Sequence, residues 1–351
     1  MSILGIHHLT AVCSNAQRTV DFYTKILGLK FVKKTVNFDD PGAYHLYFGD
    51  ETGKPGTLIT FFEWRDLPHG TWGIGTTHHL AFIVETIEAL LKWKTWLTNH
   101  EVVVTGPYDR SYFRSIYFHD PDGLILEIAT RGPGWTVDED ATNLGMQVIP
   151  APPDLIRSDR REERAASMSW EGPLKVLTKE MKIGGLHHIT AIASDIEETA
   201  KFYTEVLNLR ILKKTINYDD PSAPHYYFGV GEGKPGTVIT YFGYDEHHMR
   251  YGRIGTGMTH HFAFAVENEQ IQLEWREKLL KADVAVTPVQ ERVYFKSIYF
   301  SDPDGHVLEI ATVPPGFLID EEQENLGKGL KLPPWLFDEH EKIENALTPL
   351  V

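Results

Sequence analysis

The sequence predicts an α+β fold, a tandem duplication in which four βαβββ modules associate in pairs. Three observations support this prediction: the chain matches itself when Gly5 is laid on Gly185, each copy contains two similar units, and each unit combines short apolar strands with one amphipathic helix. Because a single module leaves one face of its sheet uncovered, we expect two modules to pair around a cavity.

Long motifs recur in the two copies. GIHHLTA returns as GLHHITA, KKTVNFDDP as KKTINYDDP, and RSIYFHDPDGLILEIAT as KSIYFSDPDGHVLEIAT. The sequence therefore divides into a first domain at 1–150, a linker at 151–183 and a second domain at 184–351. The linker is polar and charged, and we expect it to be partly helical.

Hydrophobic periodicity places the elements of the first copy. Apolar residues at helical spacing predict helices at 16–27 and 87–97. DDPG, GKPG and DPDG turns separate the remaining apolar runs, which alternate as strands do. The predicted strands of the first copy are 5–12, 31–38, 44–49, 57–64, 78–85, 102–107, 115–120 and 124–130.

Composition limits the classes of function. At 351 residues the chain is long enough to bury two hydrophobic cores without stabilising cross-links. Cys13 is its only cysteine, so we expect no disulfide within the chain. The start MSILGIHHLT lacks a basic segment and a long apolar run, which favours a cytoplasmic protein without a membrane anchor. A formal net charge of -15 disfavours nucleic acid and anionic lipid as partners. The sequence leaves the oligomeric state open, with a homo-oligomer among the options.

Each copy carries one glutamate inside an apolar strand. These residues are Glu127 in LILEIAT and Glu309 in VLEIAT. A buried carboxylate is costly unless a cation or hydrogen-bond donors compensate its charge. An arginine, Arg110 or Arg292, is one candidate partner, and a metal ion is the other.

Paired histidines favour the metal ion. Four HH dipeptides stand at equivalent strand starts: His7-His8, His78-His79, His187-His188 and His260-His261. Imidazole and carboxylate together suit Zn, Mn, Ni or Fe. Aligning KPGTLIT with PDGLILE places Thr60 where Glu127 stands, and Thr240 likewise corresponds to Glu309. The sequence therefore predicts three protein ligands, with open positions for water or substrate.

With these motifs the chain resembles the vicinal oxygen chelate superfamily, which contains glyoxalases, bleomycin-resistance proteins and extradiol dioxygenases. The tandem HHLT and HHIT, the THH and LEIAT motifs, and the arginine and tyrosine upstream of each glutamate are similar to those of its hydroquinone ring-cleaving dioxygenase branch. The resemblance covers nearly the whole chain. It implies an extradiol-type dioxygenase that uses Fe(II), O2 and a small hydroquinone- or catechol-like diol, with Mn, Ni or Zn as alternative metals.

The same resemblance implies which residues form the site. The metal ligands would be His8, His261 and Glu309. The residues that contact the substrate or support the ligands would be His7, Thr10, His260, Arg292 and Tyr299. In this hypothesis Tyr299 and His260 give or take protons as the ring opens, and Arg292 neutralises a phenolate or an enol product.

The duplication also supplies a mirror set. It comprises His79, His188 and Glu127 with His78, His187, Thr190, Arg110 and Tyr117. Pairing within each repeat would instead join His8 to His79 and Glu127, and His188 to His261 and Glu309. The sequence leaves these pairings open, and with them a second metal site.

The strands around the site carry further expectations. With a plain DPDG turn Tyr299 stands opposite Glu309, and we expect a one-residue shift or bulge to be needed before both face the cavity. His45 and His225 are interpreted as surface or core histidines rather than substrate contacts. The acidic segments DEDATN and DEEQEN are interpreted as solvated edges, with a cover over the mouth of the cavity as the alternative.

Two other classes of function compete with the dioxygenase. A glyoxalase-like isomerase or lyase would use Ni or Zn to polarise a carbonyl and would need four protein ligands, which Thr60 and Thr240 disfavour. A non-catalytic protein that binds an aromatic compound or antibiotic has no need of the repeated histidines and glutamates. The ring-cleaving dioxygenase is therefore the favoured function.

Overall fold

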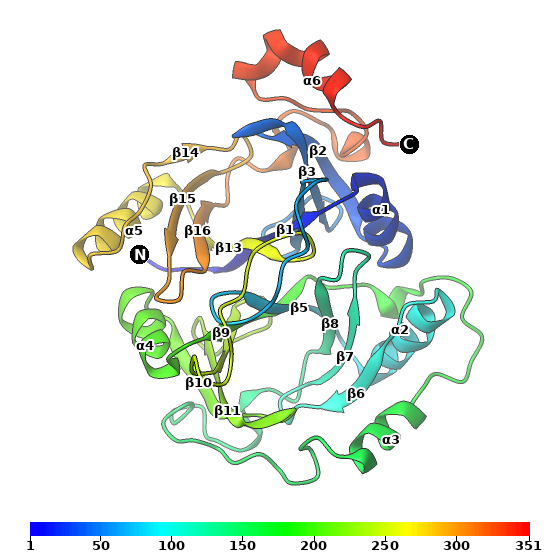
Figure 1. Ribbon diagram of the computed structural model, residues 1–351, viewed down its shortest axis with the longest axis vertical. Coiled ribbons are helices and arrows are strands. Elements are labelled where there is room, and N and C mark those ends of the chain that lie inside the picture. The colour runs from blue at the N-terminus through cyan, green and yellow to red at the C-terminus, as the bar shows by residue number, and fades with distance from the viewer.

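The strands of the two copies form two curled, eight-stranded sheets, each built from both copies (Figure 1). The structure is a computed structural model that describes residues 1–351. It confirms the predicted α+β fold of paired βαβββ modules. The first module of the chain pairs with the fourth, and the second with the third.

The first sheet contains the first and last modules. Its strands are β1 (Gly5–Cys13), β2 (Lys30–Asn37), β3 (Asp40–Gly49), β4 (Leu58–Glu63), β13 (Thr259–Val266), β14 (Gln290–Glu291), β15 (Lys296–Ser301) and β16 (Val307–Thr312). Their order is β14-β15-β16-β13-β1-β4-β3-β2. The central strands β1 and β13 run antiparallel, so each module contributes one half of the sheet.

The second sheet repeats this plan with the two middle modules. Its strands are β5 (Thr77–Val84), β6 (Thr105–Asp109), β7 (Arg114–His119), β8 (Ile125–Thr130), β9 (Leu186–Ala193), β10 (Arg210–Asn217), β11 (Asp220–Gly229) and β12 (Val238–Gly243). Their order is β10-β11-β12-β9-β5-β8-β7-β6. The predicted strand at 102–107 is displaced along the chain, because β6 begins only at Thr105 and continues to Asp109.

Helices pack against both sheets (Figure 1). They are α1 (Ala16–Asp21), α2 (Ile87–Asn99), α3 (Asp159–Ser167), α4 (Ile196–Lys201), α5 (Glu269–Lys281) and α6 (His340–Ala346). The predicted helix at 16–27 begins at the Asn15 cap and changes to a π-helical turn, η1 (Phe22–Ile26). The expected helix in the linker is confirmed as α3. Further short turns are η2 (Trp135–Val137), η3 (Lys179–Met181), η4 (Phe202–Val206), η5 (Phe317–Ile319), η6 (Gln323–Asn325) and η7 (Pro334–Glu339).

One large hydrophobic core joins the two sheets. One cluster of 55 buried residues includes Leu9 on β1, Phe262 on β13, Leu80 on β5 and Ile189 on β9. The core therefore does not divide at the linker. No helix in residues 1–351 has the length and apolar character required to cross a membrane.

Each HH dipeptide lies at a β-bulge. The register of β1 on β13 skips His7 and His260, and the register of β5 on β9 skips His78 and His187. The first histidine of every pair is thus the extra residue of a bulge. Because a bulge breaks the alternation of side chains along a strand, both histidines of a pair can lie next to each other.

The acidic segments after each repeat are exposed at most positions, but each also supplies carboxylates to a buried lysine. The ammonium group of the fully buried Lys33 lies 2.6 Å from Asp320 Oδ1 and also contacts Glu321. Lys213 makes the equivalent contacts with Asp138 and Glu139. These carboxylates are held near the sheets because a buried lysine requires a counter-charge.

Candidate metal centre

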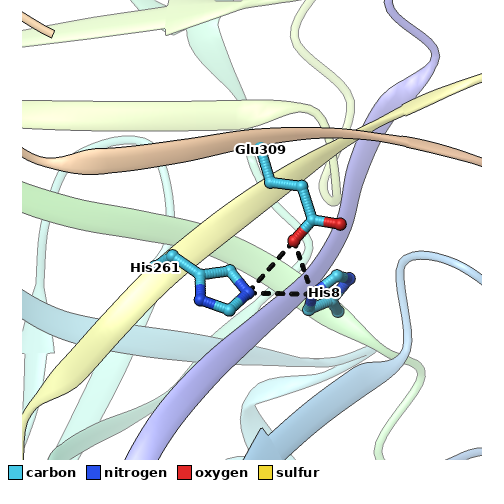
Figure 2. Close-up of side chains that lie close together, drawn as sticks. All are labelled: His8, His261 and Glu309. Carbon is cyan, nitrogen blue, oxygen red and sulfur yellow. Dashed lines mark hydrogen bonds and ion pairs between the residues drawn. The ribbon is translucent and has the colours of Figure 1, made fainter. Parts of the chain in front are cut away.

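His8, His261 and Glu309 converge on one point (Figure 2). The Nε2 atoms of His8 and His261 lie 3.3 Å apart. Glu309 Oε2 lies 3.3 Å from His8 Nε2 and 3.0 Å from His261 Nε2. The three side chains come from the adjacent strands β1, β13 and β16, and all are buried.

The donor atoms of this triad fit a divalent metal ion. Ligand atoms held at about 2.0–2.2 Å from one ion, roughly at right angles, are about 3 Å apart. Glu309 Oε2 is buried and lacks a hydrogen-bond partner, while its other carboxylate oxygen accepts a hydrogen bond from Ser297. A bound cation would satisfy the unpartnered oxygen.

Protonation also favours ligation. Burial alone would raise the pKa of Glu309, but His8 and His261 hold this pKa well below its ordinary value. Burial lowers the pKa of His261, although Glu309 partly opposes that effect. An ionised carboxylate and a neutral imidazole are the forms that bind metals.

The bulged histidines hold the ligand rings. His7 Nδ1 lies 2.9 Å from His8 Nδ1, and His260 Nδ1 lies 2.8 Å from His261 Nδ1. If the Nε2 atom of each ligand is to offer a lone pair, its Nδ1 must carry the proton and donate it to the bulged neighbour. The bulges thus orient both imidazole ligands.

Next to the triad lies a small cavity of about 30 Å³. It is lined by His8, Asn37, Phe38, Asp39, His45, Tyr47, Phe62, His261, Arg292, Phe295 and Tyr299. Of the predicted substrate-contacting residues, Arg292 and Tyr299 line this cavity. His7, Thr10 and His260 do not line this cavity. His260 instead places its ring against Phe62 and Trp64.

Tyr299 needs no shift to reach the site, so the sequence prediction of a bulge at this point is wrong. The register of β15 on β16 pairs Tyr299 directly with Glu309 and has no irregularity. Directly opposite residues of an antiparallel pair project from the same face of the sheet. The Tyr299 ring contacts that of His261 at a centroid distance of 5.6 Å.

The buried glutamates are not paired with arginine. Arg292 binds Asp39 at 2.9 Å, and Arg110 binds Asp219 at 2.7 Å. Each arginine also donates from Nε to the hydroxyl of its neighbouring tyrosine, at 3.3 Å from Arg292 to Tyr299. The predicted alternative, in which an arginine pairs with each buried glutamate, is therefore wrong.

His45 and His225 line the cavities, and both ring nitrogens of each histidine bond to neighbouring threonine and tyrosine side chains, as in a core histidine. His45 Nε2 lies 2.9 Å from Thr60 Oγ1, which lies 2.8 Å from Thr10 Oγ1. Burial lowers the pKa of His45 well below its ordinary value, so this imidazole is neutral. Thr60 is thus occupied by hydrogen bonds in the place where a fourth ligand would stand.

The mirror set forms a second triad rather than sharing ligands within a repeat. Glu127 Oε2 lies 2.8 Å from His79 Nε2 and 3.4 Å from His188 Nε2, and the two Nε2 atoms lie 3.3 Å apart. The strands that supply this triad are β5, β8 and β9. The structure brings His8 together with His261 and Glu309, and not with His79 and Glu127.

Sequence reasoning missed several residues of the first site. Ser297 holds the outer oxygen of Glu309, Asp39 anchors Arg292, and Tyr47 donates to or accepts from His45 Nδ1 at 3.0 Å. Ser297 stands two residues before Tyr299, so its side chain shares the face of Tyr299. That spacing was available in the sequence, whereas the position of Asp39 depends on how distant strands pack.

Comparisons with known proteins agree with this geometry. The family described as Glyoxalase/Bleomycin resistance protein/Dioxygenase superfamily matches residues 5–128 and 185–310. The Bacillus subtilis protein named ring-cleaving dioxygenase MhqO is 32% identical over 350 residues, covering 99% of this chain and 96% of its own. Chlorohydroquinone/hydroquinone 1,2-dioxygenase of Sphingobium indicum is 31% identical and covers 95% of this chain and 92% of its own.

A solved structure supports the same assignment. The crystal structure of a Bacillus subtilis dioxygenase superimposes with a TM-score of 0.79 at 32% identity, covering 100% of this chain and 98% of that one. The chain therefore belongs to the glyoxalase/bleomycin resistance protein/dioxygenase superfamily and, within it, to the ring-cleaving dioxygenases.

Proposed function

We propose that this enzyme is an Fe(II)-dependent, extradiol-type dioxygenase that opens the ring of hydroquinone- or catechol-like diols at His8, His261 and Glu309. The observation that carries the proposal is the convergence of these three buried donor atoms, with Glu309 Oε2 unpartnered, beside a cavity that contains Tyr299 and Arg292. The aromatic diol as substrate class is supported by the relative that acts on chlorohydroquinone and hydroquinone.

Two histidines and one carboxylate are the ligand set associated with non-heme Fe(II) oxygenases, and Fe(II) held by His8, His261 and Glu309 would supply open positions for an electron-rich substrate and O2. Thr60 supports such open positions, because its hydroxyl is committed to Thr10 and His45. The same threonine argues against a glyoxalase-like isomerase with four protein ligands.

Tyr299 and Arg292 act as a pair on the substrate oxygens. Burial raises the pKa of Tyr299, with Glu309 acting in the same direction, so the hydroxyl keeps its proton and can donate it. Arg292 Nε occupies one lone pair of that hydroxyl, which orients the proton. The guanidinium charge of Arg292 favours a phenolate or enolate in the cavity.

The aromatic walls and the histidine pairs complete the site. Phe38, Phe62 and Phe295 line the cavity and offer apolar surface to a planar ring. His7 and His260 keep the ligand imidazoles in one orientation through Nδ1, a role that does not require direct contact with substrate. Neutral His45 forms part of the cavity wall, where its two ring nitrogens bond to Thr60 and Tyr47.

The decisive test is anaerobic loading with Fe(II), followed by O2 uptake with methylhydroquinone and with catechol. We expect the wild-type enzyme to consume O2 with a diol, and Glu309→Ala to lose this uptake because the carboxylate ligand is gone. Glu309→Gln, which keeps the side-chain volume, controls for packing. Tight binding of Ni or Zn without O2 uptake from any diol would favour the isomerase instead. Loss of uptake only in Glu127→Ala would move the reaction to the mirror triad.

A further inference from the structure

The mirror triad opens onto a much larger cavity than the first triad. The cavity beside His79 and His188 has a volume of about 380 Å³, against about 30 Å³ beside His8 and His261. A volume of this size lies in the range of small-molecule sites. It is lined in part by Arg110, Tyr117 and Phe242.

The mirror triad has every feature that makes the first triad fit for a metal. Glu127 Oε2 is buried without a hydrogen-bond partner, and the other oxygen of Glu127 accepts from Ser115. His79 and His188 are held through Nδ1 by their bulged neighbours at 2.8 Å in both pairs. The second ligand set is therefore as complete as the first.

Supporting polar groups are duplicated as well. Arg110 Nε donates to the Tyr117 hydroxyl at 3.2 Å, and His225 Nε2 lies 2.8 Å from Thr240 Oγ1. If the mirror triad served only to pack the core, the unpartnered oxygen of Glu127 would destabilise the fold without compensation, because a buried polar group without a partner is costly.

The two cavities differ in what covers them. The linker helix α3 and the residues before it reach the second cavity, and Arg157, Arg161 and Glu162 line it. Arg161 binds Asp219 and Glu162. Arg157 is exposed and has no ion-pair partner.

The first cavity lacks this basic cover. Pro152-Pro153 before α3 corresponds to Pro333-Pro334 before α6, which aligns Arg157 with Asp338. No residue after Tyr299 lines the first cavity. Its charged lining consists of Arg292 and Asp39, which neutralise each other.

Charge distinguishes the second cavity. Its charged lining, apart from the triad, consists of Arg110, Arg157, Arg161, Glu162 and Asp219. The three arginines outnumber the two carboxylates, and the excess positive charge is on the partnerless Arg157 at the linker. A positive group at the edge of a cavity attracts anionic ligands.

We propose that His79, His188 and Glu127 form a second, independent site for a divalent transition metal, and that its cavity takes aromatic rings that carry an acidic substituent. The proposal of a metal site rests only on the geometry of the triad. The aromatic ligand rests on the proposed function, because the second cavity repeats the groups assigned there to diol binding.

Metal counting tests the site itself. After anaerobic loading with Fe(II) and removal of loosely bound metal, we expect two ions per chain in the wild type, one in Glu127→Ala, one in Glu309→Ala and none in the double variant. Glu127→Gln, which retains volume and the Ser115 contact, should also bind one ion, and thermal unfolding checks that each variant is folded. One ion in the wild type, retained in Glu127→Ala and lost in Glu309→Ala, overturns the proposal.

Ligand titration tests the acidic substituent. In metal-loaded Glu309→Ala, where only the second site is filled, 2,5-dihydroxybenzoate should bind about tenfold more tightly than hydroquinone under anaerobic conditions, and Arg157→Ala should remove about threefold to tenfold of that preference. Metal-loaded Glu127→Ala, where only the first site is filled, should show no such preference. Equal binding of both ligands, unchanged by Arg157→Ala, contradicts the proposed selectivity.

The two proposals fail in different ways. Absence of O2 uptake with every diol, at a stoichiometry of two ions, contradicts the proposed dioxygenase chemistry and leaves the second metal site standing. If only the Glu309 variants lose O2 uptake and each chain binds one metal ion, the result supports the first site and contradicts the second.

Discussion

Tyr299 lies directly across from Glu309, with its hydroxyl held by Arg292. In the proposed function this tyrosine contributes a proton through its arginine-oriented hydroxyl. Its neighbour in the same strand, Ser297, holds the carboxylate of Glu309. The proposal therefore gives two polar residues of β15 different roles, with Ser297 on the metal-binding carboxylate and Tyr299 on the substrate.

Replacing Tyr299 with phenylalanine separates these roles. We expect Tyr299→Phe to bind Fe(II) as the wild type does and to lose about 10²-fold or more in kcat, the usual contribution of a positioned proton donor. Metal content and steady-state O2 uptake measure the two effects. Tyr117→Phe, the equivalent change at the mirror triad, is the matched control and should leave methylhydroquinone turnover at the first site unchanged. An undiminished kcat in Tyr299→Phe would contradict the assigned role.

At the scale of elements, the DPDG hairpins of the two repeats differ by one informative residue. His306 after the second hairpin lies 2.9 Å from Asp302, while the first repeat has Leu124 at the equivalent place. Burial raises the pKa of Asp120 to about 6. Burial acts on Asp302 in the same direction, but His306 holds the pKa of Asp302 below its ordinary value.

Replacing His306 with leucine should therefore raise the pKa of Asp302 toward that of Asp120. An aspartate whose folded pKa exceeds its unfolded value destabilises the fold as pH rises from about 4 to 6, by roughly 3 kcal/mol for a shift of two units. In the wild type, the folding stability that comes from the lowered pKa of Asp302 is present above about pH 4. The folding stability that comes from the raised pKa of His306 is present below about pH 6.5 and is lost as the pH rises further.

Urea unfolding midpoints between pH 4 and 6.5 measure this difference. We expect the midpoint of His306→Leu to fall relative to the wild type as pH rises through this window. The extra hydrogen bond from Tyr241 to Asp302, at 2.8 Å, makes the shift smaller than that of Asp120. The reciprocal change Leu124→His should lower the pKa of Asp120 and give the opposite trend. Parallel pH profiles for all three proteins would contradict the argument.

Periodicity predicted most elements and the ligand types, but not the details that bring the ligands together. The bulges at His7 and His260 depend on the register of a partner strand, which a local pattern does not contain. The sequence could not show that His45 lies beside a cavity, because a lone strand histidine carries no such signal. That cavity exists only after β3 and β15 pack in one sheet.

At the scale of the whole molecule, the choice between the two pairings could not be made from the sequence. The repeats are so similar that His8 could meet either His79 or His261 with equivalent neighbours. The structure pairs β1 with β13 and β5 with β9, so each triad combines both repeats. Modules 1 and 4 form one curled sheet, and modules 2 and 3 form the other (Figure 1).

This arrangement predicts the behaviour of a half-length chain. A fragment of residues 1–183 lacks β13 but contains β5, whose THHLAFIVE motif matches THHFAFAVE. We expect the fragment to form a homodimer in which β1 pairs with the β5 strand of a second copy. Each site would then combine His8 of one copy with His79 and Glu127 of the other.

Light scattering and metal analysis test this expectation. The fragment should elute at twice its chain mass and bind about one ion per chain, and His8→Ala should remove the metal without removing the dimer. A monomeric fragment that still binds metal tightly would show that the ligands can meet within one repeat. The full-length chain, analysed in parallel, provides the reference for metal content.

The crossed pairing of the strands also decides what happens if the backbone is cut. The exposed residues Lys175 and Val176 of the linker lie outside any helix or strand, where a protease can cut, yet the two resulting pieces would remain joined through β1 with β13 and β5 with β9. The pieces are interlocked by ladders of main-chain hydrogen bonds and by a shared core. A nicked enzyme should therefore travel as one particle, keep its metal, and come apart only when it is denatured.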